Sequence, residues 1–122
     1  MGEDLVEAAV REFGEGHENH AAALNEHALS LRQAGEYTMA EPLFLQALEI
    51  GKKTIGETHP NYAIRLNNLA GLYRAMGEYT KAEPLYLEAI KIMDARLGAD
   101  HPNMQTVKAN YEHMCATRDG KV

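Results

Sequence analysis

The amino-acid sequence predicts an all-α protein built as a stack of antiparallel helix pairs, with about six helices in total. Two observations predict this class. The segment GEYTMAEPLFLQAL, from Gly35 to Leu48, is almost repeated further along the chain as GEYTKAEPLYLEAI, from Gly77 to Ile90. In both segments apolar residues recur at spacings of three and four, which is the period of a helix with one buried face. Self-similarity at a fixed period indicates a repeat protein whose helix pairs stack on their neighbours.

Copies of one repeating unit account for nearly the whole chain. Two full units align without a gap, with 19 identities in 42 positions. A third copy begins at His101 and stops halfway, and the tail of another unit precedes the first full one. We therefore predict a single domain over residues 1–122, made of a partial repeat at 3–14, full repeats at 17–58 and 59–100, and a half repeat or capping helix at 101–118.

Each full unit is predicted to contain two helices. In the second full repeat, Leu66, Leu69, Ala70 and Tyr73 mark the buried face of the first helix. Gly77 then ends this helix, because a glycine in the left-handed conformation is a common helix terminator. A second apolar series marks the second helix, which ends near Gly98 and contains Tyr79, Ala82, Leu85, Tyr86, Ala89, Ile90 and Met93.

The junctions between units carry histidine at corresponding positions, His17, His59 and His101. We predict that these residues cap the helices that follow, with proline in the first turn of the second and third copies. Pro42 and Pro84 lie about five residues into the second helices, where a proline ring removes one backbone hydrogen bond. These helices are therefore predicted either to start late or to bend slightly.

The final helix departs from the strict repeat. Exact repetition of the unit would place Lys108 and Glu112 on its buried face. The apolar residues Met104, Val107, Tyr111 and Met114 instead run one residue out of step with that expectation. We interpret this segment as a terminal helix with a polar outer side, because an open stack needs a soluble end.

Composition and charge exclude several classes of function. The net charge of −6 argues against nucleic acid as the main partner. No apolar run is long enough for a membrane span, so no membrane partner is expected. The single cysteine, Cys115, cannot form an internal disulfide, which favours a reducing compartment and a cytoplasmic location.

Enzymatic and metal-binding functions are also disfavoured. The sequence lacks a glycine-rich phosphate loop, a serine nucleophile elbow and an HExxH motif, so we predict a non-enzyme that needs no cofactor. His17 belongs to the repeated junctions, which leaves His20 and His27 as at best half of a metal site. We therefore predict no metal.

The unit from His59 to Asn103 reads HPNYAIRLNNLAGLYRAMGEYTKAEPLYLEAIKIMDARLGADHPN. It resembles the 42-residue tetratricopeptide repeat of kinesin light chains and of many bacterial proteins. The resemblance extends from about Asp4 to the last helix. It implies a right-handed α-α superhelix with a concave groove lined by the first helix of each unit, and peptide or protein binding in that groove. The first full repeat departs from the pattern at His27 and Leu31.

The candidate binding residues follow from the helix period. If Leu66, Leu69, Ala70 and Tyr73 are buried, residues spaced by four and three share the other side of the first helix. The resemblance implies that the first Asn of the LNN motif contacts the backbone of an extended peptide, and an Arg further along the same side can hold a carboxylate. Alternatively, these Asn residues bond only to neighbouring backbone. The predicted groove residues are Asn25, Leu29, Arg32, Ile64, Asn67, Gly71 and Arg74.

Two functions of different classes are compatible with these features. The first is a protein–protein interaction module that binds an extended segment of a partner, whose identity the sequence leaves open. The second is a structural role, in which terminal helices such as residues 3–14 join chains into a homo-oligomer or an end-to-end assembly. A further alternative is a fragment of a longer repeat array.

Overall fold

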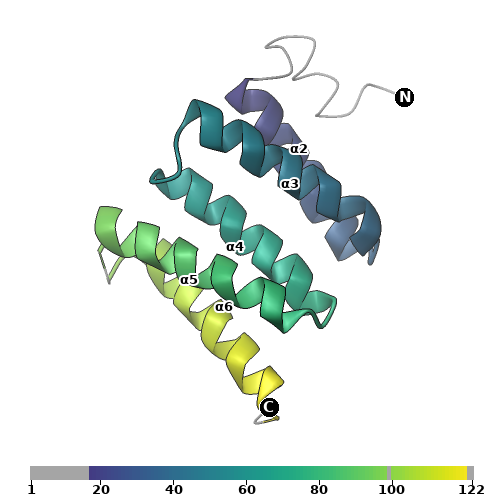
Figure 1. The fold of residues 1–122 in the computed structure, drawn as a ribbon, viewed down its shortest axis with the longest axis vertical. Helices are drawn as coiled ribbons and strands as arrows, with labels where there is room; N and C mark the ends of the chain where they lie inside the picture. Colours follow the sequence, from purple (N-terminus) through teal and green to yellow (C-terminus); the bar gives the residue numbers. More distant parts are fainter. Residues whose placement is uncertain (1–16, 99, 121–122) are drawn as a thin grey trace. The chain divides into compact units, whose positions relative to one another are not determined.

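The computed structural model describes residues 17–98 and 100–120, and within these ranges it contains five α-helices and no strand (Figure 1). The all-α class predicted from the repeat is confirmed. The helix expected at 3–14 lies outside the described residues. Contacts divide the chain into two compact units, Met1–Glu57 and Thr58–Val122, which we call the first unit and the second unit.

The first unit is a helix hairpin of α2 (Glu18–Gln33) and α3 (Tyr37–Thr54). The two helices are antiparallel, because Thr54 at the end of α3 donates a hydrogen bond of 3.5 Å to Glu18 at the start of α2. Small residues allow the helices to approach closely, and long aliphatic side chains fill the space beside them. The core cluster consists of Ala21, Leu24 and Ala47, with Leu43 and Ile50 packed against it.

The second unit contains three helices: α4 (Pro60–Ala75), α5 (Tyr79–Arg96) and α6 (Pro102–Arg118). In Figure 1, α5 lies against both α4 and α6, and α4 and α6 also contact each other. The end of α5 returns to the start of α4, where Arg96 Nη1 donates a 3.4 Å hydrogen bond to the carbonyl oxygen of Thr58. The second unit is therefore one complete helix pair followed by a single additional helix.

The helix boundaries arise from local chemistry that the sequence predicts. His17, His59 and His101 each accept a hydrogen bond at Nδ1 from the backbone N–H two residues later, at 3.0, 3.0 and 3.1 Å. The predicted capping role of these histidines is confirmed. At the other end of α4, Gly77 has a φ of +77° and its N–H bonds to the carbonyl of Arg74, while the N–H of Glu78 bonds to Tyr73. This pattern is a Schellman motif, which satisfies the last carbonyls of the helix.

The second helix of each pair runs through its proline. Helix α3 begins at Tyr37 and contains Pro42, and α5 begins at Tyr79 and contains Pro84. The alternative of a late helix start is therefore wrong. Each proline removes one backbone hydrogen bond, and buried residues beyond it, such as Phe44, continue the apolar face. Burial of that face keeps the helix intact.

The last helix, α6, buries three of the four apolar residues expected from its spacing, and the fourth, Tyr111, is half-buried. Met104, Val107 and Met114 are buried, whereas Lys108 and Glu112 are exposed. The spacing suggests that this set runs one residue out of step with the repeat, but the structure shows that it is in step with a different buried set. Its members stand one full repeat after members of a second buried set on α4: Tyr62, Arg65 and Leu72.

Helix α4 thus has two buried faces and α6 has one. The α6 residues that correspond to the other buried face of α4 are polar or partly exposed. Helix α6 therefore packs on α5 and leaves its opposite side in contact with solvent.

Candidate functional site

In the first unit, the predicted site residues lie along one side of α2. Asn25, Leu29 and Arg32 follow at spacings of four and three, which places them on a common face. All three are half-buried. Asn25 and Arg32 already interact with other groups of the protein. Each of the three side chains retains part of its surface for a further contact.

In the second unit, the corresponding residues lie on α4. Ile64, Asn67 and Arg74 are half-buried, whereas Gly71 is buried. Gly71 has no side chain to offer a ligand, so a role for it is limited to close approach of backbone. The face consequently combines one apolar side chain, one amide and one guanidinium group.

The structure pairs Asn67 with a residue that the sequence reasoning did not select. Asn110 Nδ2 on α6 donates a hydrogen bond of 3.2 Å to Oδ1 of Asn67. The two residues do not occupy equivalent places in the repeat, since exact repetition pairs Asn67 with Ala109 instead. One signal could have identified Asn110: it stands one full repeat after Asn68, the second Asn of the LNN motif.

Arg74 differs from the other arginine of α4 in its surroundings. Arg65 is only 6% exposed and interacts with other groups of the protein. Arg74 is half-buried, and its guanidinium group makes no hydrogen bond or ion pair with any residue that the structure describes. A guanidinium group carries five N–H donors and keeps its charge at all accessible pH values. Arg74 is therefore an available partner for an anion.

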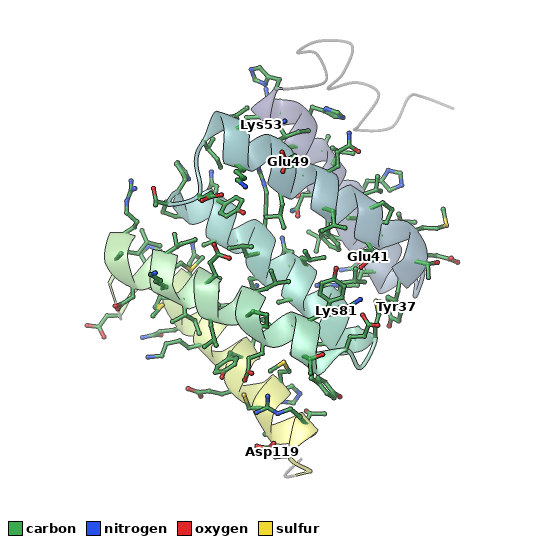
Figure 2. The ribbon with its side chains drawn as sticks, viewed as in Figure 1. Tyr37, Glu41, Glu49, Lys53, Lys81 and Asp119 are labelled. Atoms are coloured by element: carbon green, nitrogen blue, oxygen red, sulfur yellow. The ribbon has the colours of Figure 1, made fainter. Side chains whose placement is uncertain are left out.

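Polar side chains also fasten the end of α6 to α5. Glu83 Oε2 accepts hydrogen bonds from the hydroxyl of Tyr111 and from Nη1 of Arg118, both at 3.0 Å. Arg118 Nε also contacts Asp119 at 3.3 Å, at the end of α6 (Figure 2). The ring of Tyr111 lies 6.2 Å from that of the buried Tyr86. We call Glu83, Tyr111 and Arg118 the α6 latch.

The latch changes the acidity of its members. Hydrogen bonds from Arg118 and then Tyr111 lower the pKa of Glu83 below its ordinary value, because both stabilise the carboxylate. A hydrogen bond with Cys115, followed by burial and the bond to Glu83, raises the pKa of Tyr111 to about 12. Glu83 is therefore the ionised acceptor and Tyr111 the neutral donor at neutral pH.

An open hollow of about 410 Å³ is lined by residues 77–81 and Arg118. Its cations are paired locally, because Lys81 Nζ lies 3.3 Å from Glu78 and Arg118 Nη1 lies 3.0 Å from Glu83. Lys81 also lies 5.5 Å from the centre of the Tyr73 ring. None of the predicted groove residues lines this hollow. It therefore does not coincide with the Asn67 and Arg74 face of α4.

Exposed charges elsewhere form simple surface pairs. Glu49 and Lys53 lie one turn apart on α3 and are well exposed (Figure 2), and Lys53 Nζ lies 3.3 Å from Glu49 Oε1. Such pairs contribute little to stability. Among residues 17–98 and 100–120, no three His, Cys, Asp or Glu side chains gather as metal ligands would. In the same ranges, no helix combines the length and apolarity that a membrane span requires.

Comparison with known families supports the repeat assignment. The family model of the tetratricopeptide repeat matches residues 19–95 and again residues 65–107. Together these matches cover well over half of the chain, including α2 to α5 and the start of α6. A search of curated proteins finds no match.

Proposed function

The chain belongs to the tetratricopeptide repeat family, and from this premise we propose that it binds an extended segment of a partner protein along the first helices of its repeats. The family generally mediates protein–protein interactions and is typically not catalytic. The proposed partner is a protein or peptide, and no cofactor is involved. We also propose that the repeats are of the 42-residue kinesin-light-chain type, which the equal spacing of the three histidine caps supports.

One observation carries this proposal. Arg74 is a half-buried cation without an anion among the described residues, and it lies seven positions after Asn67 on the same helix. Seven residues are about two helical turns, so the two side chains share one face of α4. Burying part of a charged group without a partner is unfavourable. A ligand carboxylate would relieve this cost through paired hydrogen bonds to the guanidinium group.

The remaining predicted residues fit the same role. An extended segment presents backbone N–H and C=O groups that an amide can bond without the cost of burying a charge. Asn67 supplies such an amide on α4, beside the apolar Ile64 and the small Gly71. Asn25, Leu29 and Arg32 are the corresponding set on α2, and we assign them the same function within the first unit.

The experiment uses the full chain as bait for a displayed library of random-sequence peptides. The affinity of the best selected peptide is then measured for the wild type and for the double variant Asn67→Ala/Arg74→Ala. We expect the double variant to lose about 100-fold in affinity, because it removes one neutral and one charged hydrogen-bonding group. The free energy of unfolding should change by less than about 0.5 kcal/mol, as is usual for partly exposed positions.

A matched control carries the same types of substitution at exposed positions on the second helices. Gln46→Ala/Lys91→Ala removes an amide from α3 and a cation from α5. This control should bind the peptide like the wild type. Unchanged binding by the Asn67/Arg74 variant, or equal loss in both variants, would contradict the proposal.

We further propose a cytoplasmic location. It is supported by the single cysteine, Cys115, which is partly buried on α6.

A further inference from the structure

The hydrogen bond between Asn67 and Asn110 has a direction. Asn110 Nδ2 donates and Asn67 Oδ1 accepts, at 3.2 Å. Both side chains are half-buried, and this is the one side-chain hydrogen bond that either residue makes with the described part of the chain. It joins α4 to α6, two helices that pack on the same partner, α5.

The direction matters because a primary amide has two different ends. The oxygen accepts hydrogen bonds and the NH₂ group donates them, and an unrestrained Asn can rotate to present either end. When Asn110 holds the oxygen of Asn67, the NH₂ group of Asn67 is turned to the other side. Asn67 then offers donors to a ligand and no longer offers an acceptor in their place.

We propose that Asn110 is a positioning residue that fixes Asn67 as a hydrogen-bond donor, so that this point of the site selects a carbonyl or carboxylate oxygen of the bound segment. The inference rests on the proposed function and specifies its polarity. Arg74 on the same face is also a pure donor. Both polar side chains of this face of α4 are thereby matched to acceptor groups.

Asn110 is itself held firmly enough for this role. The preceding and following turns of α6 bury Val107 and Met114 against the second unit. The next residue, Tyr111, is bonded to Glu83 on α5 at 3.0 Å. Rotation of α6 about its axis would break these contacts, so the amide of Asn110 is presented to α4 in a defined position.

The direction of the bond can be tested in the free full-length chain. Nuclear magnetic resonance resolves the side-chain NH₂ signals of Asn67 and Asn110. We expect the NH₂ group of Asn110 to exchange with solvent more slowly than that of Asn67, and Asn67→Ala to abolish this protection. Protection of the Asn67 NH₂ group instead, lost in Asn110→Ala, would show the reverse bond and overturn the inference.

The consequence for binding is tested with the best peptide selected on the wild-type chain. Asn110→Ala frees the amide of Asn67 to rotate, and we expect a loss of about fivefold in affinity. Asn110→Asp offers only acceptors, so it turns the NH₂ group of Asn67 inward and should weaken binding further. Both effects should disappear in an Asn67→Ala background, because the coupling requires both residues.

A purely structural role of Asn110 gives a different result. The substitutions would then change the melting temperature, and their effects on affinity would be the same with Asn67 or Ala at position 67. That outcome overturns the inference while the loss of binding in Asn67→Ala/Arg74→Ala leaves the proposed function in place. Unchanged binding in that double variant would instead overturn both.

Discussion

At the scale of single residues, the clearest device is the imidazole cap. In α4 the Nδ1 atom of His59 accepts the N–H of Asn61, and Pro60 occupies the first turn, where its missing N–H costs nothing. Histidine is an unusual choice for a helix cap, since Asn, Asp, Ser and Thr are preferred. The same geometry at His17 and His101, the equivalent positions of the other copies, shows that Nδ1 of this side chain is used as a hydrogen-bond acceptor.

His59→Ala removes this cap and should lower the free energy of unfolding by about 1 kcal/mol. His59→Asn should recover most of the loss, because the Asn side chain can accept the same N–H. Urea denaturation of the three proteins at neutral pH provides the measurement. Equal stability of the wild type and the Ala variant would show that the cap contributes nothing.

The sequence predicts the three histidine caps because they recur at equivalent positions of the repeat. It also placed Asn67 and Arg74 on one side of α4, from helical spacing alone. It could not find Asn110, because the bond to Asn67 depends on how α6 lies against α4. A periodic pattern identifies equivalent positions, whereas a diagonal contact between neighbouring helices joins positions that are not equivalent.

At the scale of elements, α6 is attached mainly to α5, with a smaller contact to α4. Its buried residues Met104, Val107 and Met114 form one face, and the α6 latch holds its far end. Helix α4, in contrast, forms a complete antiparallel pair with α5. The docking of α6 is therefore coupled to the ionisation of one carboxylate, that of Glu83.

The latch predicts a pH dependence of known sign. Because the pKa of Glu83 is lowered in the folded state, its contribution to stability is fully present above the ordinary carboxyl pKa of 4.5 and is lost as the pH falls through the lower folded value. Glu83→Gln should accelerate amide hydrogen exchange in α6 at neutral pH. In acid the wild type should approach the rate of the variant.

Glu88→Gln, at an exposed position of α5, the helix that also carries Glu83, serves as the control. It should leave exchange in α6 unchanged. A Glu83→Gln variant whose α6 exchanges at the wild-type rate at neutral pH would show that packing alone holds the helix.

At the scale of the whole molecule, the sequence predicts the helical class, the paired helices and the polar end. The repeat permits this because each helix pair is stabilised mainly by its nearest neighbours. The apolar face predicted for the last helix is confirmed at Met104, Val107 and Met114, and Lys108 and Glu112 are exposed. The sequence alone did not reveal that this face corresponds to a second buried face of α4.

The polar outer side of α6 should limit association through that face. Lys108→Leu/Glu112→Ala restores the residue types found at the corresponding positions of α4, and so creates an apolar face without a covering helix. We expect the average mass in sedimentation equilibrium to rise with concentration more steeply for this variant than for the wild type. Identical profiles would show that the polar residues do not act as a cap.

The most direct test of the binding face is to titrate the selected peptide into isotopically labelled chain and follow individual groups by nuclear magnetic resonance. The proposed function predicts shifts at the side-chain NH₂ of Asn67 and Nε–H of Arg74, with little change at Leu87, which is 46% exposed on α5. Shifts concentrated around Leu87, with Asn67 and Arg74 unmoved, would contradict it.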